Sequence, residues 1–202
     1  MKTIEKAVIL GFVFTLLISI TGFKAHCDNI EQKVLRLHVI ANSDTKEDQE
    51  LKLKVRDRVL SYSKDIFVDV ADKKDAEKLT NDNLLAIKKV AQEEVLKNGY
   101  NYPVDVELKN THFNTRVYDE VTLPAGNYDA LRVVIGDGNG KNWWCVMFPP
   151  MCLPAAEEKC ELSEVLDESE LKIVSNKSRY EVKFKVVELF EELKNFAESR
   201  IS

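Results

Sequence analysis

Four cysteines and three histidines are the residues whose types could carry nucleophilic or metal chemistry. His112 could activate the thiol of Cys145, but Trp144 and Val146 flank this cysteine, and apolar neighbours raise rather than lower a thiol pKa. The sequence contains no G-x-S-x-G, H-E-x-x-H or C-x-x-C motif. His38 falls in an apolar stretch, where a hydrogen-bonded or surface-facing histidine is the usual interpretation. We therefore predict no catalytic residue, no metal site and no cofactor.

Glycines cluster at Gly136–Gly140, a pattern that could form a phosphate-binding loop. The cluster lacks the G-K-[ST] ending and a following helix N-terminus. Asp129, Asp137 and Asn139 could bind calcium, but their spacing is not that of an EF-hand. The sequence therefore predicts a hairpin turn here.

The run Asn142–Leu153 holds both tryptophans, two cysteines and two adjacent prolines. Because an interior proline interrupts helices and central strands, we expect a short buried strand followed by a rigid proline corner. The corner could bring Cys145 and Cys152 into a disulfide, worth about 2–3 kcal/mol; two reduced, buried cysteines are the alternative. Aromatic anchors dominate interface energetics. The candidate partner-binding residues are therefore Trp143, Trp144, Phe148, Pro149 and Pro150, although both tryptophans could instead belong to the core.

A second group of polar residues surrounds an apolar strand near the start of the folded region. Arg36 lies within the strand, and Asn42–Asp44 follow its end. They could form a buried network that ties the strand to the first helix through Arg56 or Arg58. The functional alternative is a recognition patch at the end of the strand, formed by Arg36, Asn42 and Asp44.

The periodicity of the chain changes from helical to alternating. A strand at 34–41 precedes helices predicted over about 45–63 and 73–97. Alternating strands follow from residue 104, with a central strand at 128–135 and another at 143–148. This order predicts an α+β fold with a single domain, an antiparallel sheet and helices packed on one face.

The C-terminal region begins with an acidic connector over 154–177, with one short helix expected near Ser163. Ser178 and Glu181 have the spacing of a capping box, which predicts a C-terminal helix over 178–202. Its apolar residues are expected to pack on the sheet: Tyr180, Phe184, Val187, Phe190 and Leu193. An exposed amphipathic helix that binds a partner is the alternative.

The N-terminal residues 1–26 resemble an export signal, since Lys2 and Lys6 precede the apolar stretch Ala7–Ile20. No clean cleavage site follows, so a cleaved signal and a retained membrane anchor through residues 7–23 both remain open. Outside the cytoplasm, cysteines can oxidise and remain oxidised. Residues 27–202 then form the folded domain, with a core at 34–153.

The chain carries a net charge of −5, and its basic residues form no block. Nucleic-acid binding normally requires a clustered positive surface, so we predict no nucleic-acid partner.

Two segments resemble the stage II sporulation protein R family of endospore-forming bacteria. The first is Leu35–Asp44 (LRLHVIANSD), followed by Asp48–Lys52 and Val55–Asp57. The second is Leu123–Ala130 (LPAGNYDA), continuing to Asn142–Cys152 (NWWCVMFPPMC). The long Asn-Trp-Trp-Cys to Pro-Pro-x-Cys block is chemically unusual and therefore specific.

The resemblance implies an exported signalling protein rather than an enzyme. Such a protein is made in the forespore and exported into the space between the two membranes. There it activates a membrane-embedded aspartic protease of the mother-cell membrane, which processes a sigma-factor precursor. The alternatives are an exported hydrolase that acts on the cell wall and a structural envelope protein of the forming spore. The family provides no catalytic residues to transfer, and Cys27 and Cys160 lie outside the matching segments.

Overall fold

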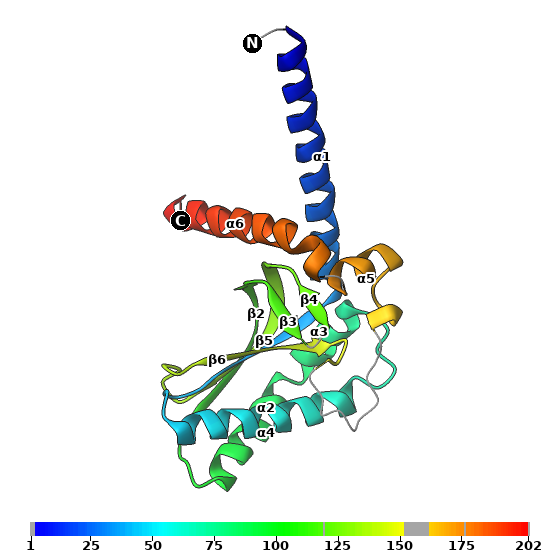
Figure 1. Cartoon of the computed structure of the whole chain (residues 1–202). Coiled ribbons are helices and arrows are strands. Elements are labelled where there is room, and N and C mark those ends of the chain that lie inside the picture. Colours follow the sequence, from blue (N-terminus) through cyan, green and yellow to red (C-terminus); the bar gives the residue numbers. More distant parts are fainter. Residues whose placement is uncertain (1–2, 119, 152–161, 176, 202) are drawn as a thin grey trace. The chain divides into compact units, whose positions relative to one another are not determined.

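A computed structural model of the chain describes residues 3–118, 120–151, 162–175 and 177–201 (Figure 1). They divide into two compact units, one formed by 1–31, 112–126 and 166–202, the other by 32–111 and 127–165. The helices are α1 (Thr3–Lys33), α2 (Lys46–Ile66), α3 (Lys73–Asp82), α4 (Leu84–Lys97), α5 (Glu168–Val174) and α6 (Lys177–Ile201), with a 3-10 turn at Leu162–Glu164. The strands are β1 (Leu35–Ile40), β2 (Val104–Phe113), β3 (Arg116–Tyr118), β4 (Val121–Leu123), β5 (Gly126–Ile135) and β6 (Asn142–Phe148).

The main sheet has four strands in the order β2-β5-β1-β6. β1 runs parallel to β5 and antiparallel to β6. The predicted α+β class with an N-terminal apolar segment is confirmed, but the sheet is mixed rather than antiparallel throughout. The predicted hairpin at Gly136–Gly140 is wrong for the same reason: β1 lies between β5 and β6, so their connecting loop crosses the end of β1.

One face of this sheet packs on helices α2 and α4. The alternate side chains of β1 that face the helices are apolar, and Leu35, Leu37 and Val39 are all fully buried. The alternating side chains of the strand and one side of each helix thus form a single hydrophobic core. Helices α2 and α4 contribute Leu51, Val55, Val59, Ile87 and Val95 to it. This core fixes the position of β1 and β6, the two strands that carry the candidate residues.

Local residue chemistry explains where the helices begin and end. The Thr45 side chain caps α2 by accepting a hydrogen bond from the Asp48 amide at 3.3 Å. The predicted single helix over 73–97 is two helices, because the chain breaks at Asn83 between α3 and α4. Gly99 follows α4 with φ of 84°, the left-handed conformation expected of a C-terminal glycine.

The other unit contains α1, the two-stranded β3–β4 sheet, α5 and α6. The first helix does not end near residue 26 but continues to Lys33, and its later residues Phe23, Cys27 and Ile30 are buried. Its earlier part is long and apolar enough to cross a membrane. Residues 154–161 and 176 of the predicted connector at 154–177 lie outside the described residues, and α5 occupies its later part with a capping box between Asp167 and Glu170. A single domain over 27–202 stays a prediction.

Candidate partner-binding surface

The two segments predicted to contact a partner lie side by side in the sheet. β1 carries Arg36 and β6 carries both tryptophans, and these strands are antiparallel neighbours. Arg36 lies opposite Val146, and His38 lies opposite Trp144. Segments about a hundred residues apart in sequence are therefore one structural feature, as long-range strand pairing allows.

The tryptophans lie on opposite faces of the sheet, because side chains alternate along a strand. Trp143 lies on the helix side, where the Arg56 guanidinium carbon is 4.3 Å from the centre of its ring system. Trp144 stacks on His38, with ring centroids 3.7 Å apart and planes inclined by 15°. Both tryptophans are half-buried. Each indole thus packs against a side chain of this chain, and only its remaining surface is open to a partner.

The contacts of His38 hold two strands together, which is a structural role. Its Nε2 atom lies 2.8 Å from Oδ1 of Asn142. Burial lowers the pKa of His38; the hydrogen bond with Asn142 opposes this shift, and the positive charge of Arg132 adds to it. The imidazole is therefore held neutral near neutral pH, where it ties β1 to β6 and supports the ring of Trp144.

Arg36 is fully buried, with 0% of its surface exposed. Its guanidinium carbon lies 4.7 Å from the centre of the Tyr128 ring on the neighbouring strand β5, a cation–π arrangement. The polar network that was predicted to join this strand to the first helix through Arg56 is replaced by a contact with β6. Arg56 lies on the ring of Trp143 and pairs with Asp57. The structure therefore places Arg36 away from the surface.

Asn42, Ser43 and Asp48 form the centre of a polar network, here called the latch, at the end of β1. Asn42 Nδ2 and Ser43 Oγ both donate to Oδ2 of Asp48, at 2.9 and 2.6 Å. Burial alone would raise the pKa of Asp48, but these hydrogen bonds, together with one from Tyr102, outweigh it and lower the pKa. The latch thus joins β1 to α2 through an ionised carboxylate.

The latch also holds the loop between β5 and β6. The Asp137 amide donates to Asn42 Oδ1 at 3.0 Å, and the Lys141 amide donates to Asp44 Oδ1 at 2.7 Å. Lys52 Nζ donates to the Lys141 carbonyl at 2.9 Å. The side chains of Asn42 and Asp44, predicted as partner contacts, therefore have internal partners, and the glycine-rich loop has a structural role.

The metal and nucleophile alternatives gain no geometric support. Asp129, considered above as a calcium ligand together with Asp137, instead forms an ion pair with Lys73 at 2.6 Å. Within residues 3–118, 120–151, 162–175 and 177–201, no group of three or more His, Cys, Asp or Glu side chains could hold a metal ion. His112 lies 2.9 Å from the side chain of Asn195.

Cys145 is buried and disulfide-bonded, so it offers no thiol to a nucleophilic mechanism. Its predicted partner Cys152 lies outside the described residues, as does Cys160, and the pairing of Cys145 with Cys152 stays a prediction. Cys27 is a free, fully buried cysteine of α1.

The proline corner borders an apolar pocket of about 230 Å³, here called the corner pocket. Phe148 is buried and meets Phe67 edge to face at 6.3 Å between centroids, Pro149 is buried, and Pro150 is half-buried. The pocket is lined by the end of α2, the turn after it and the end of β6: Leu60, Ser63, Lys64, Phe67, Val68, Val70, Met147, Phe148 and Pro150. Of the predicted corner residues, Phe148 and Pro150 therefore line a concave surface.

The opposite wall of the corner pocket was not predicted from sequence. Val68 is 68% exposed, and Asp69 beside it has φ of 64°. Asp tolerates this left-handed conformation better than most residues, and the turn leaves Val68 in solvent at the rim of the pocket. The available signal was the short apolar group Phe67, Val68 and Val70, which interrupts the helical period after α2.

The α+β fold follows an apolar N-terminal helix whose length and composition match those of an export signal or a membrane anchor. The family model for stage II sporulation protein R matches residues 31–158. The chain belongs to this family, and the matched region contains β1, β6, the latch and the proline corner.

A curated relative supports the same assignment. The chain is 37% identical over 123 residues to stage II sporulation protein R of Bacillus subtilis (strain 168). The alignment covers 61% of this chain and 55% of that protein, so the chain matches little more than half of its relative's length. No solved structure matches the chain.

Proposed function

We propose that this chain is an exported sporulation signalling protein that activates a membrane-embedded aspartic protease. The protease, in the mother-cell membrane, then processes the precursor of a sigma factor. Membership of the stage II sporulation protein R family carries this proposal. The protein acts by binding and is not itself an enzyme, and it works from the space between the two membranes.

The corner pocket is the proposed contact with the protease. It is concave, apolar and bounded by aromatic and proline side chains that the buried disulfide-bonded strand β6 holds in place. Pockets of this kind receive the anchor residues of a partner, which contribute most of the binding free energy. An apolar side chain from an extracytoplasmic loop of the protease would fit the pocket's size and chemistry.

Reconstitution in a non-sporulating host tests the function. The chain, the candidate protease and the sigma-factor precursor are co-expressed, and cleavage of the precursor is measured with and without residues 1–26. Cleavage that depends on the chain supports an activator. Absence of cleavage with all three proteins present contradicts it.

A matched pair of substitutions tests the pocket. Val68→Asp adds a charge at the pocket rim, and we expect it to lower precursor cleavage at least tenfold, because a buried charge opposes apolar docking. Leu85→Asp is the control, since Leu85 is 84% exposed on α4 and does not line the corner pocket. Equal cleavage by both variants, at equal protein levels, would remove the pocket from the proposed contact.

A further inference from the structure

Helix α6 carries an apolar stripe in contact with solvent. Its residues recur at alternating steps of four and three, so they share one side of the helix. They are 36–77% exposed and comprise Val182, Val186, Leu189, Leu193 and Phe196. Single exposed apolar residues are ordinary, but a continuous apolar surface of this length indicates a binding surface.

The opposite side of α6 is already packed against α1. Phe184 is buried and meets Phe23 edge to face, with ring centroids 5.4 Å apart. Glu191 is 2% exposed and pairs with Lys24 at 2.8 Å. The contacts that hold α6 in this unit therefore use a different side of the helix, and the apolar stripe is not needed for them.

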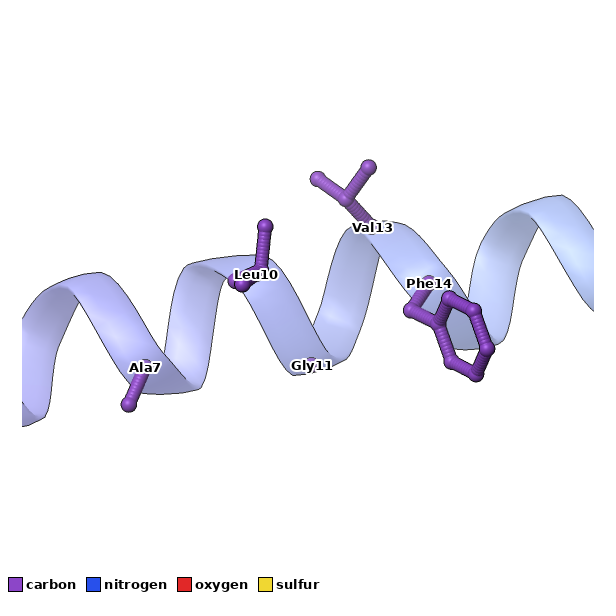
Figure 2. Close-up of a pocket in the computed structure, with 5 residues that line it drawn as sticks. All are labelled: Ala7, Leu10, Gly11, Val13 and Phe14. Atoms are coloured by element: carbon purple, nitrogen blue, oxygen red, sulfur yellow. The ribbon is translucent and has the colours of Figure 1, made fainter.

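Residues 7–18 of α1 are apolar except for Thr15, and those whose side chains are described are exposed. Figure 2 shows Ala7, Leu10, Gly11, Val13 and Phe14 on successive turns of this helix, with Val13 pointing away from Ala7 and Phe14. A long helix that is apolar all round is stable inside a protein core or a membrane. Since its side chains are exposed in this unit, a membrane is the environment that would cover them.

One edge of the α6 stripe lies beside the start of this apolar half of α1. Lys183 Nζ donates to Ser19 Oγ at 3.0 Å, one turn closer to the N-terminus of α1 than Phe23. Lys183 shares a side of α6 with Val186 and Phe190, three and seven residues later. Within this unit α6 runs crosswise to α1, whose N-terminal half projects past it (Figure 1).

The two apolar surfaces meet at one hollow. Ile20 of α1 lines this hollow of about 250 Å³ together with Val186 and Phe190 of α6. Thr21, Lys24 and Asp28 also line it, so the apolar surface of the first helix meets the stripe beside an ion pair. A bilayer that covers one would reach the other.

We propose that α6 lies in the headgroup region of the membrane that α1 enters, with its apolar stripe toward the acyl chains. Amphipathic helices bind membranes in this orientation when one side is apolar and basic residues border it. By helical spacing, Lys183 and Lys194 follow one border of the stripe and Lys185 follows the other. Their long aliphatic stems suit the boundary, since they leave the ammonium groups in the polar headgroup layer.

Site-specific photo-crosslinking of the full chain tests this orientation. The protein is reconstituted into vesicles of phosphatidylethanolamine and phosphatidylglycerol, with p-benzoylphenylalanine at position 193 or, as the matched control, at position 181. Glu181 is exposed on the same helix but lies away from the stripe. We expect lipid adducts at position 193 in about tenfold excess over position 181 by mass spectrometry.

Three results would overturn the proposal. One is a crosslink at position 193 to a second copy of the chain or to another protein instead of lipid, and another is equal lipid labelling at both positions. The third uses Leu189→Glu with Leu193→Glu and the probe at position 186: we expect about a tenfold loss of adduct, and an undiminished yield contradicts the proposal. Near-ultraviolet circular dichroism verifies that this double variant is folded, and Glu181→Gln with Glu192→Gln should leave the yield unchanged.

Discussion

Gly140 is predicted to be the glycine of the structure least tolerant of a methyl group. A Cβ atom there would lie 2.2 Å from the carbonyl oxygen of Ser43, 2.6 Å from its carbonyl carbon and 2.8 Å from Cβ of Ala41. Two of these atoms are backbone, so no flexible side chain can move aside. The loop must shift away from β1 instead.

The cost of Gly140→Ala follows from what that shift would break. Overpacking typically costs about 1–3 kcal/mol. The shift also stretches the hydrogen bond from the Gly140 amide to the Ala41 carbonyl, now 2.9 Å long, and losing such a bond adds about 1 kcal/mol. We therefore expect a loss of about 3 kcal/mol, which is a large part of the usual 5–15 kcal/mol stability of a domain.

Urea unfolding of the full chain in detergent, followed by tryptophan fluorescence, measures this loss, because both tryptophans lie in β6 beside the loop. Gly99→Ala is the matched control. Gly99 has no neighbouring atom within 4 Å of the added methyl group but has φ of +84°, so only backbone conformation opposes the substitution, at about 1–2 kcal/mol. If Gly140→Ala costs no more than Gly99→Ala, the close packing of the loop on the latch is refuted.

Three further outcomes can be measured on the same protein. The fold holds the pKa of His38 below its ordinary value, so the wild type should lose stability as pH falls below about 6.5, and His38→Phe should lack this component; an unchanged pH profile would contradict it. Lys73→Met removes a cation that is 3.0 Å from Glu77 and 2.6 Å from Asp129 and should cost about 3 kcal/mol at pH 7, with a smaller loss near pH 5 because burial raises the pKa of Glu77 and favours its protonation. A cost independent of pH would argue against this coupling. Non-reducing peptide mapping should link Cys145 to Cys152, and a link from Cys145 to Cys160 would disprove the predicted pairing.

The strands were predictable from sequence because alternation and apolar runs are local properties, but their order was not. The glycine-rich loop has the composition of a hairpin turn, and nothing in its own residues reveals that β1 inserts between β5 and β6. Asn42 and Asp44, about a hundred residues earlier in the chain, hold this loop across the end of β1. The side chains of Asn42 and Asp44, which were predicted to contact a partner, therefore hold the connection between two strands of the sheet instead.

The apolar residues of α6 show a second limit. Of the five residues expected to pack on the sheet, Phe184 and Val187 are buried, and Phe184 packs on Phe23 of α1. Phe190 and Leu193 are 54% and 59% exposed, so their assignment to the packed side was wrong. Later steps of three residues drift around a helix with 3.6 residues per turn. The packed side continues instead to Glu191, whose partner Lys24 lies in the predicted targeting segment. Helical spacing alone could not reveal that a charged pair extends the packed side.

One wall of the candidate site could be predicted from the sequence, and the other could not. The proline corner was evident from its unusual composition, whereas the other wall of the corner pocket depends on a turn at Asp69 that sequence periodicity does not encode. Arg36 was singled out as a polar residue in an apolar strand, but its position beside Tyr128 follows from the parallel pairing of β1 with β5. A local turn thus decided the first case, and long-range strand pairing decided the second.

The position of β1 in the sheet sets an order on the assembly of the protein. This strand leaves a ribosome or an export channel before either of its neighbours, since both β5 and β6 lie beyond residue 125. Pairings of such high sequence separation form slowly and late. The first strand therefore stays unpaired until about two thirds of the chain, through β5, has been made, and the sheet is complete only when β6 has followed. Any step that holds back the C-terminal third of the chain would thus also hold back closure of the sheet.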